Sequence, residues 1–314
     1  MNRRNFLLTT FGGIAGGLLP RNSLLGQNAT PSTSSAPPPT PVPLVPEFRA
    51  VRRNVGFFTC RGGTIGSLAN ADGVTAVDAQ FPDSAKLFLD GLPDRKGRKL
   101  DVLINSHHHG DHTGGNKVFQ PETKIIVAQE NVPGLQKAAA AMNGNEADQV
   151  YAGTLFAKEW KTSVGDEVIR TTYFGPAHTN GDCIIHFEKA NVVHTGDLMF
   201  NRIYPAIDRR AGASIKNWIV ILGTISTMFD KGTLYIFGHA QKDAAVTGNN
   251  ADLLVLRDYF NGLLEYTQKE IKAGKTKEQI MAAEELPGFP DFRAPKPNRL
   301  ASNLDIAFQE LSPG

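Results

Sequence analysis

The feature that most constrains this 314-residue chain is a run of four histidines within six positions, in the segment Ser106–His112 (SHHHGDH). The segment directly follows the apolar stretch Leu100–Asn105, which is predicted to form a β-strand. Because alternate residues of extended backbone project to the same side, the first and third consecutive histidines can converge while His108 faces away. Gly110 permits a tight turn that brings the next acid and histidine beside them. Imidazole and carboxylate groups suit zinc in a hydrolytic site, so the run predicts a metal centre.

Three more polar residues follow predicted strands in the same way. His178 follows Val168–Phe174, Asp197 follows Val192–Thr195, and His239 follows Leu234–Phe237. A chance histidine-rich surface loop would not be accompanied by these residues at comparable strand ends. Polar residues of the metal-ligand type therefore recur at the ends of several predicted strands.

Strands and helices are predicted in alternating blocks, which favours a layered α/β protein. Further strands are expected at Val55–Cys60, Ile65–Asn70, Val74–Asp78, Ile125–Ala128 and Ile184–Glu188. Helices are expected at Asp83–Leu92, Leu135–Met142 and Asp252–Ala273. The last of these has leucine and phenylalanine on one face, as expected of a helix that packs on a core.

The order His-x-His-x-Asp-His, then a lone His, then Gly-Asp and finally Gly-His resembles the metallo-β-lactamase-fold hydrolase superfamily. The resemblance covers about residues 50–250. It implies an α/β fold that is a four-layer αββα sandwich, with metal ions at one edge. Residues 48–314 are expected to form a single domain of this kind.

The resemblance also implies a ligand set and a mechanism. The first metal would be held by His107, His109 and His178, the second by Asp111, His112 and His239, with Asp197 bridging both. Two Zn²⁺ per chain are expected, with iron or manganese as open alternatives. A metal-bridging hydroxide would attack the substrate, and the catalytic acids Asp111 and Asp197 would act first as ligands, with a general-base role open for either.

Other residues are candidates for supporting roles. Asp78 ends a predicted strand and, in the resemblance, matches an acid near the metal loop, which implies a hydrogen bond to a metal ligand. His194 precedes Asp197 by three positions and is a second candidate for such a contact. A turn acid and a packed core histidine are the alternative interpretations. The segment 200–214 is the predicted specificity loop, where Arg202 and Tyr204 would orient an anionic substrate unless the loop is simply solvated.

The expected reaction is cleavage of an ester, lactone, thioester or related carbonyl bond in a small molecule. An aspartate stands where one group of zinc β-lactamases has a cysteine, which weakens but leaves open the alternative of a β-lactamase. A second alternative is an iron-dependent redox member of the same fold. The 33 basic and 31 acidic residues nearly balance, so no nucleic-acid partner is expected, and the oligomeric state is left open.

The N-terminal region differs in composition from the rest of the chain. Arg3 and Arg4 precede a short apolar stretch, so residues 1–29 resemble a twin-arginine export signal, with a frayed, unprocessed helix as the alternative. Residues 30–47 are rich in Pro, Ser and Thr and should form an extended spacer. Such a signal predicts a periplasmic or secreted protein without stable membrane insertion after processing.

Overall fold

Adjacent residues of the strands face opposite sides of the sheet and are apolar on both sides. In the computed structural model, which describes residues 43–312, Phe57 lies between two sheets, whereas its neighbour Phe58 packs under helices. In the same way, Val102 lies between the two sheets and its neighbour Leu103 packs under the helices. Strands that are buried on both faces require covering layers on each side, so this pattern dictates a multilayer fold.

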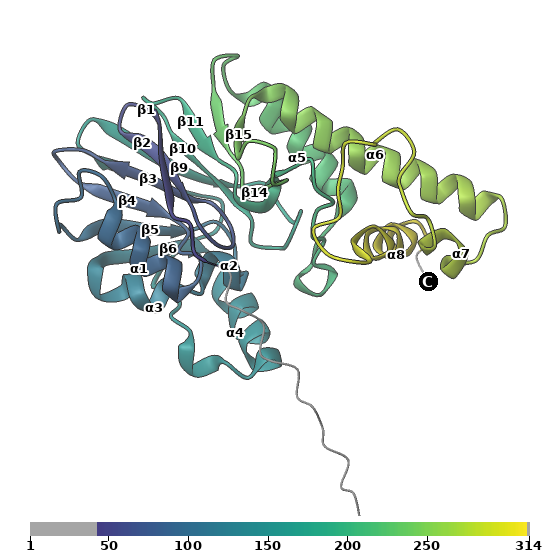
Figure 1. The fold of residues 1–314 in the computed structure, drawn as a ribbon, viewed down its shortest axis with the longest axis horizontal. Coiled ribbons are helices and arrows are strands. Elements are labelled where there is room, and N and C mark those ends of the chain that lie inside the picture. Colours follow the sequence, from purple (N-terminus) through teal and green to yellow (C-terminus); the bar gives the residue numbers. More distant parts are fainter. Residues whose placement is uncertain (1–42, 313–314) are drawn as a thin grey trace, which may run out of the picture. The chain divides into compact units, whose positions relative to one another are not determined.

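The first sheet has seven strands in the order in which they occur along the chain (Figure 1). The first four strands pair antiparallel, and β4 to β7 pair parallel. The strands are β1 (Glu47–Arg52), β2 (Val55–Thr59), β3 (Ile65–Ala69), β4 (Val74–Val77), β5 (Leu100–Asn105), β6 (Thr123–Gln129) and β7 (Thr154–Phe156).

The second sheet has six strands in the order β15-β13-β11-β10-β9-β8. Its pairs are antiparallel except for β11 with β13, which run parallel. The strands are β8 (Glu159–Val164), β9 (Glu167–Tyr173), β10 (Cys183–Phe187), β11 (Val192–His194), β13 (Leu234–Ile236) and β15 (Thr247–Gly248). A separate parallel pair joins β12 (Phe200–Asn201) to β14 (His239–Ala240).

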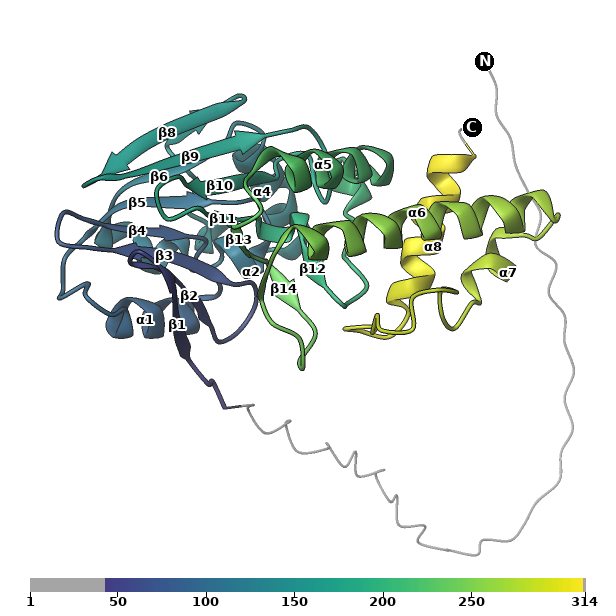
Figure 2. The same ribbon diagram turned by 90° about the horizontal axis from the view of Figure 1, so that it is seen from above.

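Helices cover the outer face of each sheet. On the first sheet lie α1 (Pro82–Gly91), α3 (Asn116–Phe119) and α4 (Val132–Asn143), and on the second lie α5 (Ile215–Met228) and α6 (Asn250–Lys272). Figure 2 shows α6 running beyond the sheets, where α7 (Lys277–Met281) and α8 (Arg299–Leu311) pack beside it. The short elements are α2 (Gly110–Thr113), η1 (Gln120–Glu122), η2 (Glu146–Asp148), η3 (Gly196–Leu198) and η4 (Arg209–Ala211).

Three apolar layers separate these four layers of secondary structure. One lies between the sheets, one lies between the first sheet and α1, and the largest lies between the second sheet, α5 and α6. Cys183 belongs to the layer between the sheets and Cys60 packs near α1, and both thiols are free. The predicted four-layer αββα sandwich is therefore confirmed.

The predicted strands and helices are present, with ends that differ by a few residues. The sequence pattern predicted neither α5 nor α8. Helix α5 has the sequence IKNWIVILGTISTM, whose many β-branched residues favour strands when they are considered alone. The helix forms nonetheless because one of its faces, which includes Trp218 and Leu222, is buried against the second sheet and α6.

The predicted export signal, residues 1–29, lies outside the described residues, as does the spacer up to residue 42. Residues 43–46 belong to no helix or strand, and β1 begins at Glu47. The export and localisation of the protein therefore stay predictions. Within residues 43–312, every helix is too short or too polar to cross a membrane.

Candidate metal centre

The carboxyl ends of several strands meet at one edge of the sandwich and carry the predicted ligands. Strand β5 leads directly into His107 and His109, and the chain then turns into α2, which carries Asp111 and His112. Strand β11 leads to Asp197, and the neighbouring parallel strand β13 leads to His239 at the start of β14. The fold thus brings together residues that are up to 132 positions apart, from His107 to His239.

His107, His109 and His178 form the first cluster. The Nδ1 atom of His109 lies 3.2 Å from Nε2 of His107 and 2.8 Å from Nε2 of His178. Their ring nitrogens and a carboxylate oxygen of Asp197 lie close enough to share one metal ion. The side chains of His107 and His178 are completely buried, whereas that of His109 is 24% exposed.

Asp111, His112 and His239 form the second cluster. Nε2 of His239 lies 3.1 Å from Oδ2 of Asp111 and 3.4 Å from Nε2 of His112. These three atoms are also close enough to share one metal ion. His112 is completely buried, whereas Asp111 is 30% exposed and forms part of the open side of the centre.

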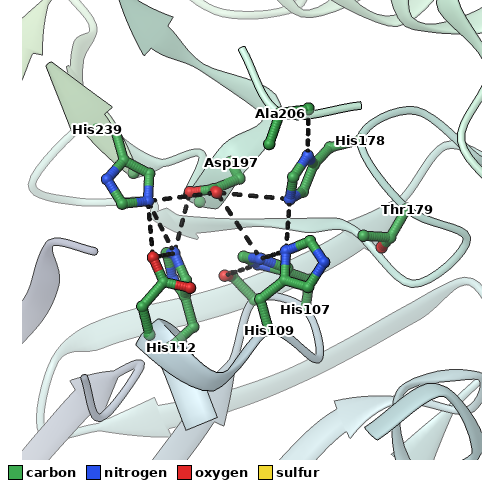
Figure 3. A network of polar contacts seen from close by, with 12 residues as sticks. His107, His109, His112, His178, Thr179, Asp197, Ala206 and His239 are labelled. Carbon is green, nitrogen blue, oxygen red and sulfur yellow. Dashed lines mark hydrogen bonds and ion pairs between the residues drawn. The ribbon is translucent and has the colours of Figure 1, made fainter. Parts of the chain in front are cut away.

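Asp197 lies between the two clusters, as Figure 3 shows. Its Oδ1 atom is 3.0 Å from Nε2 of His112, and its Oδ2 atom is 3.4 Å from Nε2 of both His178 and His239. The carboxylate is 4% exposed. One carboxylate therefore contacts histidines of both clusters, as expected of a residue that bridges two metal ions.

The outward-facing ring nitrogens of four histidines contact oxygen atoms. These contacts are His107 Nδ1 to Ser106 Oγ (3.0 Å), His109 Nε2 to Asp208 Oδ2 (2.9 Å), His178 Nδ1 to the Ala206 carbonyl (2.8 Å) and His112 Nδ1 to Asp78 Oδ2 (2.8 Å). A neutral imidazole that donates outward directs its other nitrogen's lone pair inward. Converging lone pairs repel one another unless a cation lies among them, so the donor set fits divalent metal ions such as zinc.

The two clusters differ in whether their surroundings lower or raise the pKa of their histidines. Burial lowers the pKa of His178 to about 3 and also holds the pKa of His107 well below its usual range. Burial also opposes the protonation of His239, but the carboxylates of Asp197 and Asp111 outweigh it and raise the pKa of His239 to about 9. The second cluster therefore favours positive charge more strongly than the first.

Asp78 contacts the centre as the sequence analysis expected. Its carboxylate accepts hydrogen bonds from the backbone N–H and the hydroxyl of Ser106, and from Nδ1 of His112. Because Ser106 also accepts from His107, Asp78 orients one histidine of each cluster. Its side chain is completely buried, so these contacts also satisfy a carboxylate that has no access to water.

His194 contacts backbone groups and not a carboxylate, which favours the packed core histidine over a contact with a metal ligand. Its Nε2 atom lies 3.1 Å from the carbonyl oxygen of Thr64, and its Nδ1 atom accepts a hydrogen bond from the backbone N–H of Gly196. The side chain is completely buried. His194 thus supports the turn that precedes Asp197 through the backbone, in keeping with the packed core histidine considered as the alternative.

Tyr204 lies in a hydrophobic core and not beside the clusters, so its predicted contact with substrate is corrected. It is 5% exposed and its ring packs against Tyr259 and Phe292. Its backbone N–H donates to the carbonyl of Arg293, and the N–H of Arg293 donates to the carbonyl of Arg202. The specificity loop is therefore anchored on the C-terminal segment, and a substrate-orienting role for Arg202 stays a prediction.

Several residues of the centre were not identified from the sequence. Ser106 links Asp78 to His107, and Asp208 accepts from His109. The carboxylate of Asp182 accepts hydrogen bonds from the backbone N–H and the hydroxyl of Thr179, beside His178, and burial raises its pKa to about 7. Asp208 precedes Arg-Arg-Ala-Gly and caps η4, and this Asp-to-Gly turn pattern is the signal that could have marked it.

Two glycines allow the backbone to approach the ligands closely. A Cβ atom at Gly63 would collide with the ring of His112, and one at Gly238 would collide with the carboxylate of Asp197. Both positions therefore exclude every other residue unless the ligands move.

The sequence matches the family described as Metallo-beta-lactamase superfamily over residues 68–254. This match spans more than half of the chain and includes all the predicted ligands. The protein therefore belongs to the metallo-beta-lactamase superfamily, and it is a metal-dependent hydrolase.

Relatives and similar structures agree with this assignment. A hydroxyacylglutathione hydrolase from Brucella ovis is 24% identical over 238 residues, which cover 73% of this chain and 80% of the relative. A sec-alkylsulfatase from Pseudomonas sp. has a TM-score of 0.64 at 15% identity over 85% of this chain, which spans only half of that protein. A metallo-beta-lactamase from Pontibacter korlensis has a TM-score of 0.57 at 15% identity, over 69% of this chain and 99% of its own. At these identities the two structures show the shared fold alone.

Proposed function

We propose that the protein is a dinuclear zinc hydrolase that cleaves an ester, lactone or thioester bond in a small molecule. The observation that carries the proposal is the position of Asp197 between two clusters of inward-directed histidine nitrogens. Three nitrogens with one carboxylate oxygen, and two nitrogens with two carboxylates, are ligand sets suited to catalytic zinc. Zinc ions bound there would lower the pKa of a water molecule and polarise the bond to be cleaved.

The side chains of this chain determine how a substrate reaches the centre. Asp111, His109 and His239 are between 22% and 30% exposed, whereas the other four predicted ligands are almost completely buried. Substrate and water therefore approach from the side of these three residues. Asp111 is the one carboxylate of the predicted set that faces this side, so it is the better placed of the two acids to accept a proton from the attacking water.

Two observations support carbonyl chemistry. The Brucella ovis relative is named for the hydrolysis of hydroxyacylglutathione, a thioester, and it aligns with 73% of this chain. The bridging position carries Asp197 and not the cysteine that one group of zinc β-lactamases has there.

The proposal is tested with zinc-loaded protein and four substrate classes: a glutathione thioester, an acyl lactone, a chromogenic cephalosporin and a phosphodiester. We expect two zinc ions per chain and the highest kcat/KM on the thioester or the lactone. The Asp197→Ala variant serves as the control for contaminating activity. The highest kcat/KM on the cephalosporin would support a β-lactamase instead, and one tightly bound iron without hydrolysis would support a redox enzyme.

A further inference from the structure

The carboxylate of Asp208 lies behind the first cluster and is held rigidly by the backbone. Its Oδ1 atom accepts hydrogen bonds from the N–H groups of Arg210 and Ala211, both at 3.1 Å. The N–H of Asp208 itself donates to the carbonyl of His178. These contacts fix the other carboxylate oxygen, Oδ2, at 2.9 Å from Nε2 of His109.

His109 depends on this contact more than its neighbours depend on theirs. His107 and His178 are completely buried, so packing restricts their rings, whereas His109 is 24% exposed. A histidine ring that is partly free can rotate or change tautomer. A hydrogen bond from Nε2–H to Asp208 selects the tautomer whose Nδ1 lone pair faces His107 and His178.

We propose that Asp208 is a positioning residue that holds His109 in its metal-binding tautomer and thereby sets the affinity of the first cluster for a divalent cation. The inference rests on the proposed dinuclear function and extends it to a residue outside the ligand set. His108 does not share this role, because its Nε2 atom lies 3.9 Å from Oδ2 of Asp208, beyond hydrogen-bond distance.

His108, His109 and Asp208 are also close enough together to hold a cation of their own. His109 would then have to turn its Nε2 lone pair toward Asp208, which places a proton on Nδ1. His178 would accept that proton in a hydrogen bond at Nε2, 2.8 Å away, because its own Nδ1 donates to Ala206. Nδ1 of His109 would then be lost to the first cluster, so a neutral His109 can serve only one of the two sites at a time.

The test uses Asp208→Asn, which is nearly isosteric and keeps one oxygen for the backbone N–H groups of η4 while it turns an N–H group toward His109. Metal-free protein is titrated with Co²⁺ against a chelator, and the visible absorption of bound Co²⁺ is recorded. We expect the first-cluster affinity to fall about 10- to 100-fold, with a changed absorption band. The second-cluster affinity should change less than about threefold.

Asp258→Asn is the matched control, because Asp258 is exposed on α6 and pairs with its neighbour Arg257. It should bind both ions like the wild type. Asp208→Ala should bind Co²⁺ as weakly as Asp208→Asn and should also lose some thermal stability, because alanine no longer caps η4. The affinity therefore reports on the positioning of His109, and the difference in stability reports on the cap of η4. If Asp208→Asn kept the Co²⁺ affinity and spectrum of the wild type, the positioning role of Asp208 would be refuted and the proposed function would stand. If the wild type bound no Co²⁺, both the positioning role and the proposed function would be refuted.

Discussion

The first and second clusters share Asp197 but differ in their electrostatics. Burial keeps His107 and His178 neutral, and no carboxylate other than that of Asp197 lies among their inward nitrogens in the described part of the chain. In the second cluster, Asp111 and Asp197 surround His239 and favour its protonated form. The first cluster is therefore ready to bind a metal ion, whereas the second cluster must first release at least one proton.

Replacing the shared residue should have the largest effect, because it damages both clusters at once. In Asp197→Ala we expect kcat/KM to fall at least about a thousandfold, or about 4 kcal/mol of transition-state stabilisation. Metal analysis should find less than one tightly bound zinc ion per chain. A variant that kept two zinc ions would show that Asp197 does not join the clusters.

Single replacements should separate the two halves. His178→Ala and His239→Ala should each lose one zinc ion and lower kcat/KM by about a hundredfold or more. The far-ultraviolet circular dichroism of both variants should match that of the wild type, because the three apolar layers are untouched. Loss of both metals in either variant would mean that the clusters bind cooperatively and cannot be treated as two sites.

The difference in charge predicts a difference in pH dependence. The raised pKa of His239, about 9, and the raised pKa of His112 mean that the second cluster holds protons at pH 7. A metal ion must displace them, so its affinity should rise at least about tenfold per pH unit up to about pH 9. The lowered pKa of His178, about 3, means that no such proton is displaced there between pH 6 and pH 8. Calorimetry in buffers of different ionisation enthalpy measures the protons released by each binding step. Equal proton release at both steps would contradict the comparison.

The smallest effect is expected at a residue outside both clusters. In Tyr204→Phe the ring keeps its packing on Tyr259 and Phe292 and loses a hydroxyl group that interacts with the backbone of Leu286. KM should stay within about twofold, and the free energy of unfolding should fall by about 0.5–1.5 kcal/mol. A tenfold rise in KM would restore the interpretation of Tyr204 as a substrate contact.

The sequence located the predicted ligands because their positions follow from local rules. The His107–His112 run is contained in one strand end and one turn. Asp197 and His239 follow the adjoining strands β11 and β13, and His178 lies in the connection between β9 and β10. The contacts of Tyr204 and Asp208 depend instead on the path of the loop between β12 and α5. That path has no periodicity that a sequence pattern could reveal, and it is determined by packing against the C-terminal segment.

The fold shows the same division between local and long-range causes. Strands such as β5 are apolar, end at a turn signal and could be recognised alone. Helix α5 could not, because its β-branched residues favour a strand until the second sheet and α6 bury them. Asp182, likewise, acquires its raised pKa only from burial, which the sequence does not express.

Backbone hydrogen bonds join Arg293 to the loop at Arg202 and Tyr204, so changes in the C-terminal segment during evolution also act on this loop. The same loop carries Ala206 and Asp208, which brace two imidazoles of the first cluster. Mutations near residue 293 can therefore disturb the geometry of the first cluster without changing any of the predicted ligands. Sequence changes in the C-terminal segment are therefore coupled to the geometry of the metal centre through the backbone of this loop.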